Sequence, residues 1–171
     1  MVHSAEKSEL FVSVIEAHKG ILFKITNSYC KNAEDRKDLL QEIIIQLWKS
    51  FDHYDSHFKF STWIYRIALN VSITYFRKAN RRRQVYGAIT DDILWMSEEN
   101  TSNTLEIEIN YLHHSISELK PLDKALMILY LEENSYKDIA LIMGISETNV
   151  GTKINRIKAV LKEKFSTIKT L

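Results

Sequence analysis

The chain has little cysteine, proline or glycine: its 171 residues include one Cys, one Pro and four Gly. The single cysteine, Cys30, excludes an internal disulfide framework and fits a reducing cytoplasm. Because Pro and Gly are scarce while Leu, Ile, Lys and Glu are abundant, helices are favoured over strands nearly everywhere. The composition therefore predicts an all-α protein.

Long apolar runs and catalytic signatures are also missing. No run approaches the roughly 18 residues that span a bilayer, and the N-terminal segment lacks the apolar stretch of a signal peptide. We therefore expect a cytoplasmic protein without direct membrane insertion. The sequence has no phosphate-binding Gly loop, HExxH, nucleophile elbow or kinase signature. His53 and His57 have only Asp52 and Asp55 nearby, which does not predict a metal site. We expect no catalytic residues and no cofactor.

The charges are unevenly distributed, although the net charge is only +1. Residues 77–83 carry five basic side chains and no acidic one, and residues 91–108 carry six acidic side chains and no basic one. Residues 146–171 carry six basic side chains against two acidic ones. This pattern predicts two basic surfaces joined by an acidic segment.

Apolar spacings of three and four residues predict helices over 9–29, from the break at Asn32 to 51, and over 61–78, the last one capped by Ser61. The periodicity fades over 84–103, where we expect a flexible acidic linker with a short helical turn near 93–96. It returns from 104. The sequence therefore predicts two small helical domains, 1–83 and 104–171, joined by the linker 84–103.

The second domain contains a candidate helix-turn-helix over 135–158. Ser135 and Ser146 are placed to cap its two helices, and Gly144 suits the left-handed end of the first one. In a helix-turn-helix the second helix lies in the DNA major groove. The alternative is a helical hairpin in a protein-binding bundle. On the outer face of the second helix, the candidate DNA-contacting residues are Thr148, Asn149, Thr152, Lys153 and Arg156.

The third helix of the first domain is unusually aromatic and basic. Its expected core side carries Trp63, Ile64, Ile67, Ala68, Val71 and Tyr75, and its other side carries Tyr65, Arg66, Leu69, Asn70, Ile73, Phe76 and Arg77. Rings beside cations suit single-stranded nucleic acid, because bases stack on rings while phosphates meet charge. The alternative for the basic run 77–83 is a solvated helix end that favours the helix dipole.

Three stretches, taken in order, resemble the extracytoplasmic-function (ECF) sigma factors of bacterial RNA polymerase. They are DLLQEIIIQLWK at 38–49, FSTWIYRIALNVSITYFRK at 60–78, and the helix-turn-helix ending NVGTKINR at 149–156. The resemblance implies a non-catalytic subunit that binds core polymerase and directs promoter-specific initiation. It also implies an N-terminal domain that binds the clamp helices of the largest subunit and opens the minus-ten element. The C-terminal domain would read the minus-35 element and rest on the polymerase flap.

The resemblance also assigns roles to residues of this chain. Those implied at the core-polymerase contact are Asp38, Gln41, Glu42, Trp48 and Lys49. Those implied at minus-ten DNA are His57, Phe58, Lys59, Phe60, Ser61, Arg66, Asn70, Arg77 and Lys78. The minus-35 residues are the five already named on the last helix. Many members of the family are held inactive by an anti-sigma factor, which is a further expected partner.

Two other functions fit parts of the sequence. A stand-alone regulator would bind duplex DNA as a dimer, but the aromatic and basic third helix argues against it. A helical adaptor that binds only proteins would show no salt-dependent affinity for DNA.

Overall fold

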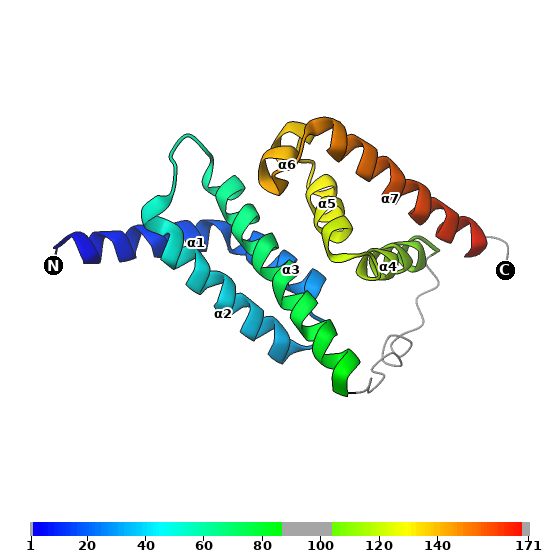
Figure 1. The fold of residues 1–171 in the computed structure, drawn as a ribbon, viewed down its shortest axis with the longest axis horizontal. Coiled ribbons are helices and arrows are strands. Elements are labelled where there is room, and N and C mark those ends of the chain that lie inside the picture. Colours follow the sequence, from blue (N-terminus) through cyan, green and yellow to red (C-terminus); the bar gives the residue numbers. More distant parts are fainter. Residues whose placement is uncertain (1, 87–103, 169–171) are drawn as a thin grey trace.

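In the computed structural model, the backbone of residues 2–86 and 104–168 is described, with the side chains of 5–81 and 109–166. These residues form helices and no strand, which confirms the predicted all-α class (Figure 1). The helices are α1 (Val2–Tyr29), α2 (Ala33–Ser50), the short 3-10 helix η1 (Phe51–His53), α3 (Phe60–Tyr86), α4 (Thr104–Ser117), α5 (Pro121–Leu131), α6 (Tyr136–Met143) and α7 (Glu147–Ile168). The predicted linker falls largely outside the described residues.

The N-terminal helices α1, α2 and α3 pack against one another around an apolar core. Its fully buried members include Leu22, Ile25, Leu39, Ile43, Leu47 and Ile64. The turn between α1 and α2 is fixed by Asn32, whose side chain accepts a hydrogen bond of 2.7 Å from the backbone N–H of Asp35. This cap satisfies one of the donors left free at the start of a helix. The sequence break predicted at Asn32 is thereby confirmed.

Helix α3 differs from its prediction at both ends. It begins at Phe60, and the N–H of Trp63 already donates to the carbonyl of Lys59. Ser61 therefore lies in the first turn, and its predicted role as N-cap is wrong. The helix continues to Tyr86, well beyond the predicted end near Lys78, because no Pro or Gly occurs before residue 87 to stop it.

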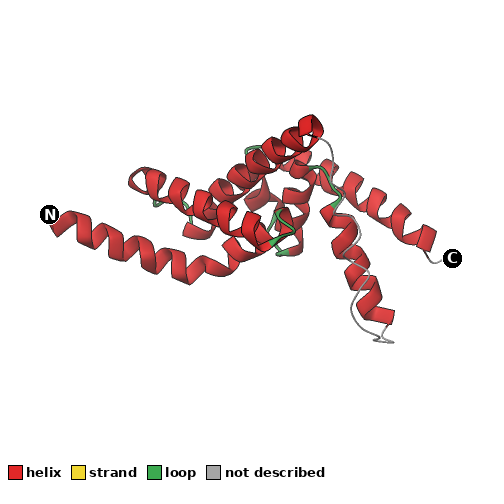
Figure 2. Ribbon diagram, turned by 90° about the horizontal axis from the view of Figure 1, so that it is seen from below, coloured by secondary structure: helices red, strands yellow, loops and turns green. Residues whose placement is uncertain are grey.

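The C-terminal helices α4 to α7 form a second packed unit. Helices α5 and α6 both pack on α7, and α4 lies against α5 and α7. Figure 2 shows the described parts of the chain as helices joined by loops and turns. The fully buried side chains at its centre are Leu126, Leu129, Ile139, Val150 and Ile154. Val150, Ile154, Ile157 and Leu161, spaced by four, three and four residues, form the buried inward face of α7.

The two units are in contact, because α5 and α6 lie against α3 (Figure 1). This contact changes the interpretation of the aromatic and basic side of α3. Tyr65, Leu69 and Ile73 are buried, whereas the sequence placed them on an outward face. The prediction that these three side chains line an open nucleic-acid surface is wrong for this arrangement, since the second unit covers them. The periodicity of one helix cannot show which of its two apolar faces another unit will cover.

Gly144 ends α6 with φ = +67°, in the left-handed region that the sequence predicted for it. An L side chain costs about 1–2 kcal/mol in this conformation. We therefore expect Gly144→Ala to lower the free energy of unfolding by about that amount, as measured by urea denaturation. Gly20→Ala is the matched control. Gly20 lies inside α1 with open space around it, so its replacement should be stabilising by up to about 1 kcal/mol. Equal effects of both substitutions would contradict the role given to Gly144.

Candidate protein and nucleic-acid interfaces

The outward face of α2 combines polar and apolar side chains. Asp38, Gln41, Glu42 and Lys49, all predicted contact residues, are exposed on it. Trp48 is 38% exposed and Ile45 is 46% exposed on the same helix. An apolar centre with a polar rim is typical of a protein-binding surface. We call these six residues the α2 face.

Trp48 and Ile45 are the two apolar residues of the α2 face. Trp48 is only partly exposed, because its ring meets Phe11 edge-on, with centroids 5.0 Å apart, and the Nζ atom of Lys7 lies 4.6 Å above it. Ile45 was not among the predicted contact residues, although in the sequence it falls on the same side of the helix as Asp38, Gln41 and Glu42. An isoleucine on the outer side of an amphipathic helix was the signal that could have identified it.

A cluster of stacked rings supports the loop between η1 and α3. The rings of Tyr54 and Phe60 stack with their centroids 4.2 Å apart, and Trp63 lies edge-on to Tyr54 at 5.4 Å. The ring centroids of Phe51 and Trp63 are 5.9 Å apart. Most aromatic side chains of this region therefore contact one another and do not form open stacking platforms. Phe58 is the exception among them, with 39% of its surface exposed.

Hydrogen bonds shape the tip of this loop. The carboxylate of Asp55 accepts from the backbone N–H of His57 at 2.9 Å and lies 2.6 Å from its Nδ1 atom. The backbone hydrogen bond, followed by the side-chain one, lowers the pKa of Asp55. The hydroxyl of Tyr54 donates to the carbonyl of Phe58. The predicted residues His57, Phe58 and Lys59 therefore project from an ordered turn, whereas Phe60 and Ser61 are partly buried at the start of α3.

The polar residues predicted on α3 remain accessible. Arg66, Asn70, Arg77 and Lys78 are all exposed. Arg66, Asn70 and Arg77 are spaced by four and seven residues, which places them along one side of the helix, next to the side that the second unit covers. Lys78 follows Arg77 around the helix, on a different side. The structure therefore leaves a basic strip that starts beside the loop and runs along α3.

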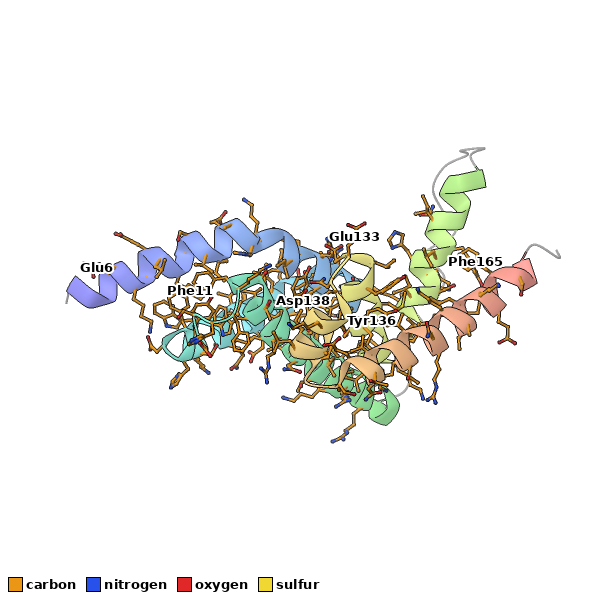
Figure 3. All side chains as sticks on the ribbon, turned by 90° about the horizontal axis from the view of Figure 1, so that it is seen from above. Glu6, Phe11, Glu133, Tyr136, Asp138 and Phe165 are labelled. Atoms are coloured by element: carbon orange, nitrogen blue, oxygen red, sulfur yellow. The ribbon has the colours of Figure 1, made fainter. Side chains whose placement is uncertain are left out.

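The helix-turn-helix has the caps that the sequence predicted. The hydroxyl of Ser135 accepts from the N–H of Asp138 at 3.1 Å and donates to its carboxylate at 2.6 Å. The hydroxyl of Ser146 accepts from the N–H of Asn149 at 3.2 Å. Figure 3 labels Asp138 and Tyr136, both from α6. Gly151 of α7 packs beside the ring of Tyr136, where an added Cβ atom would lie 3.4 Å from the ring, in ordinary van der Waals contact.

The outward side of α7 carries most of the predicted DNA-reading residues. Thr148, Asn149, Thr152 and Arg156 are exposed, and the hydroxyl of Thr152 donates to the carbonyl of Thr148 at 2.9 Å. Lys153 is half-buried instead. It lines a cavity of about 360 Å³ between the two units, together with Arg77 from α3 and with Lys120, Pro121, Leu122 and Asp123. Lys153 is thus the one predicted α7 residue that lies at the junction.

Within residues 2–86 and 104–168, no helix is long and apolar enough to cross a membrane. The same part of the chain contains no group of three or more His, Cys, Asp or Glu side chains that could hold a metal ion.

Comparison with known proteins identifies the family of the chain. Residues 14–82 match the family model of Sigma-70 region 2, and residues 109–161 match that of Sigma-70, region 4. The ECF RNA polymerase sigma factor SigM of Bacillus subtilis is 30% identical over 153 residues, which span 87% of this chain and 91% of SigM. The chain belongs to the ECF sigma factor family. Another ECF sigma factor of Bacillus subtilis, SigW, is 25% identical over 91% of this chain and 88% of its own length.

Two solved structures share the fold of this ECF sigma factor. CnrH, in complex with the cytosolic domain of CnrY, aligns with a TM-score of 0.66 and 17% identity over 94% of this chain and 90% of its own. RpoE from Bartonella quintana, in complex with the anti-sigma factor NepR, aligns with a TM-score of 0.67 and 19% identity over 93% of this chain and 96% of its own. Residues 14–82 and 109–161 of the ECF sigma factor correspond to the two units seen in the fold.

Proposed function

We propose that this ECF sigma factor acts as a non-catalytic specificity subunit that binds core RNA polymerase through its α2 face. The observation that carries the proposal is that one chain combines an α2 face with an apolar centre, a basic strip along α3 and a helix-turn-helix whose second helix has an exposed polar side. Ile45 and Trp48 form the apolar centre of the α2 face, and Asp38, Glu42 and Lys49 provide charged neighbours. Such a surface fits a partner with a complementary apolar patch and charged rim. By family resemblance, that partner is the pair of clamp helices of the largest subunit, in the cytoplasm.

The loop and the basic strip of α3 would capture the minus-ten element. Phe58 offers an exposed ring for an unpaired base, and the side chain of Asn70 can pair with a base edge. Arg66, Arg77 and Lys78 would hold the phosphates of that strand. Base stacking compensates in part for the base pairs lost when the duplex opens, which is why one surface can both recognise and melt DNA.

Helix α7 would read the minus-35 element in the major groove. The side chains near its start, Thr148, Asn149 and Thr152, are in the position that reaches base edges in a helix-turn-helix. Arg156 lies one turn further on, where it can meet a guanine edge or a phosphate. The flap contact of this unit and the existence of an anti-sigma factor are proposed from the family, and the complex of the related RpoE with NepR supports the latter.

Replacement of Arg156 by Ala tests the assignment of α7. We expect the holoenzyme to lose roughly 5- to 150-fold in affinity for its promoter, corresponding to about 1–3 kcal/mol for a bidentate base contact. Affinity for core polymerase should not change. The measurement is titration of reconstituted holoenzyme on a labelled promoter fragment. Lys162→Ala, on the exposed surface further along α7, is the control. A parallel loss of core binding and promoter binding would overturn the assignment.

A further inference from the structure

Helix α1 begins at Val2, earlier than the sequence predicted. Its first turns lie before the part of the chain that matches the family model of Sigma-70 region 2. They nevertheless pack against the end of α2, because Lys7 and Phe11 both contact the ring of Trp48. In Figure 3, Phe11 lies where α1 passes the end of α2. A segment outside the matched region therefore reaches the α2 face.

The indole ring of Trp48 is held by two contacts of different direction. The ring of Phe11 meets it edge-on, with an interplanar angle of 74°, and Phe11 itself is buried. The Nζ atom of Lys7 lies over the face of the indole, 4.6 Å from its centroid. A ring face attracts a cation at this distance, because the π-electrons make the face negative. The two contacts restrain the ring while 38% of Trp48 stays exposed on the α2 face.

Asp52 fixes the position of this cation. The Nζ atom of Lys7 donates a hydrogen bond of 2.7 Å to the carboxylate of Asp52, which belongs to η1. Lysine has a flexible four-carbon stem, and much rotamer freedom is lost when its end is held in one place. The ring alone would therefore hold the ammonium group only part of the time. The carboxylate gives the ammonium a second partner, so α1, α2 and η1 meet at one charge.

The Lys7–Asp52 ion pair contributes little to the stability of the fold. The side chain of Asp52 is 63% exposed and that of Lys7 is 29% exposed. Ion pairs so close to water add little to the free energy of folding, because water competes for both charges. The core of the first unit is formed by other residues, among them Leu39, Ile43 and Leu47. The main effect of the ion pair is therefore on the ring that Lys7 touches.

We propose that Lys7 is a positioning residue of the core-polymerase site, which is fixed by Asp52 and holds the indole of Trp48 in the orientation that binds polymerase. The restraint on the ring stands on the contacts alone, whereas its effect on binding rests on the proposed function. Tryptophan is a frequent anchor of protein interfaces. An anchor that is already ordered in the free chain loses less side-chain entropy on binding, which strengthens the complex. Lys7 acts through Trp48 and needs no contact of its own with polymerase.

Fluorine NMR of the free, full-length chain labelled with fluorotryptophan tests the restraint. The signal of Trp48 is identified by its absence in Trp48→Leu, and its solvent isotope shift between H2O and D2O reports how much water reaches the ring. We expect Lys7→Gln and Asp52→Asn each to increase this shift. Asp52→Asn leaves the lysine in place, so its effect reports release of the ring. The matched control is Lys19→Gln, because Lys19 is also ion-paired on α1, to Glu16. An isotope shift that neither Lys7→Gln nor Asp52→Asn changes would overturn the restraint.

A double-mutant cycle measures the effect of Lys7 on binding to core polymerase. Lys7→Gln should weaken binding roughly 2- to 12-fold, the range expected when one side chain must be ordered on binding. In the Trp48→Leu background, the same substitution should change affinity less than about twofold, because no ring is left to position. Lys7→Arg should bind as the wild-type chain does, since a guanidinium also stacks on a ring and pairs with a carboxylate. Equal losses in both backgrounds would mean that Lys7 contacts polymerase directly, which contradicts the positioning role.

The two measurements separate the role of Lys7 from the proposed function. If Lys7→Gln releases the ring but leaves core affinity unchanged, while Ile45→Glu still lowers it, the positioning role is wrong and the α2 face stands. If the wild-type chain does not bind core polymerase at all, the proposed function fails, and the role of Lys7 in binding fails with it. The NMR result then still decides whether Lys7 restrains the ring of Trp48.

Discussion

Ile45→Glu is expected to lower the affinity of the chain for core polymerase by roughly 30- to 1,000-fold, which corresponds to about 2–4 kcal/mol for a central interface residue. Ile45 is 46% exposed at the middle of the α2 face, so it contributes little to the core of the chain itself. In a complex, the same side chain would be fully desolvated, and a carboxylate there would be buried without a partner. Binding of labelled chain to core polymerase measures the effect.

The control for this substitution is Val12→Glu. Val12 is also an exposed apolar residue, but it lies on α1 and is not part of the α2 face. Its replacement should change core affinity by less than a factor of about two, since isolated surface substitutions usually have small effects. Both variants should keep the unfolding free energy of the wild-type chain within about 0.5 kcal/mol. Equal affinities of the two variants for core polymerase would contradict the proposal that the α2 face binds core polymerase.

Ile154→Ala should cause a large loss of stability in the second unit. Ile154 is fully buried on the inner side of α7, between α7 and the helices that support it. Truncation of a buried isoleucine to alanine costs about 2–5 kcal/mol, because apolar contact is lost and a cavity remains. For a unit of this size, that is a large part of the total stability. Urea unfolding, followed by fluorescence and circular dichroism, is the measurement.

The control on the same helix is Val160→Ala. Val160 is exposed, and alanine has the higher helix propensity, so we expect a change of less than about 0.5 kcal/mol. Because Ile154 supports α7 and not α2, Ile154→Ala should abolish recognition of the minus-35 element before it affects core binding. A loss of stability as small as that of the control would mean that α7 is not packed as described.

Local signals in the sequence predicted the helix-turn-helix well. Ser135, Gly144 and Ser146 each act through neighbours one turn away, so their roles follow from short-range chemistry. The inward face of α7 was equally predictable, since only one of its sides is apolar. The α2 face was only partly predicted, because Ile45 was not among the predicted contact residues.

Long-range packing could not be predicted in the same way. Helix α3 has two apolar sides, and the sequence could not show that the second one, with Leu69 and Ile73, would be covered by α5 and α6. Lys124 gave no signal either, because an isolated lysine in an apolar helix usually reaches solvent with its charged end. Its burial depends on two rings supplied by the other unit, Tyr29 and Phe76.

The ring cluster shows a related limit. The sequence has many aromatic side chains ahead of the basic residues 77–83, and their number suggested an open surface on which nucleic-acid bases could stack. In the structure the rings of Tyr54 and Phe60 stack, Trp63 lies edge-on to both, and the three rings support the loop from which Phe58 projects. The sequence shows how many aromatic residues this region has, but it does not show which rings pack against one another and which are exposed.

The measurement that tests the central claim most directly is run-off transcription from fragmented genomic DNA by core polymerase with and without the chain. Our account predicts discrete transcript starts that need the chain, that share sequence elements near minus 35 and minus ten, and that vanish with the Ile45→Glu variant. Transcript starts identical to those of core polymerase alone, obtained with a chain that is folded and present in excess, would contradict the account.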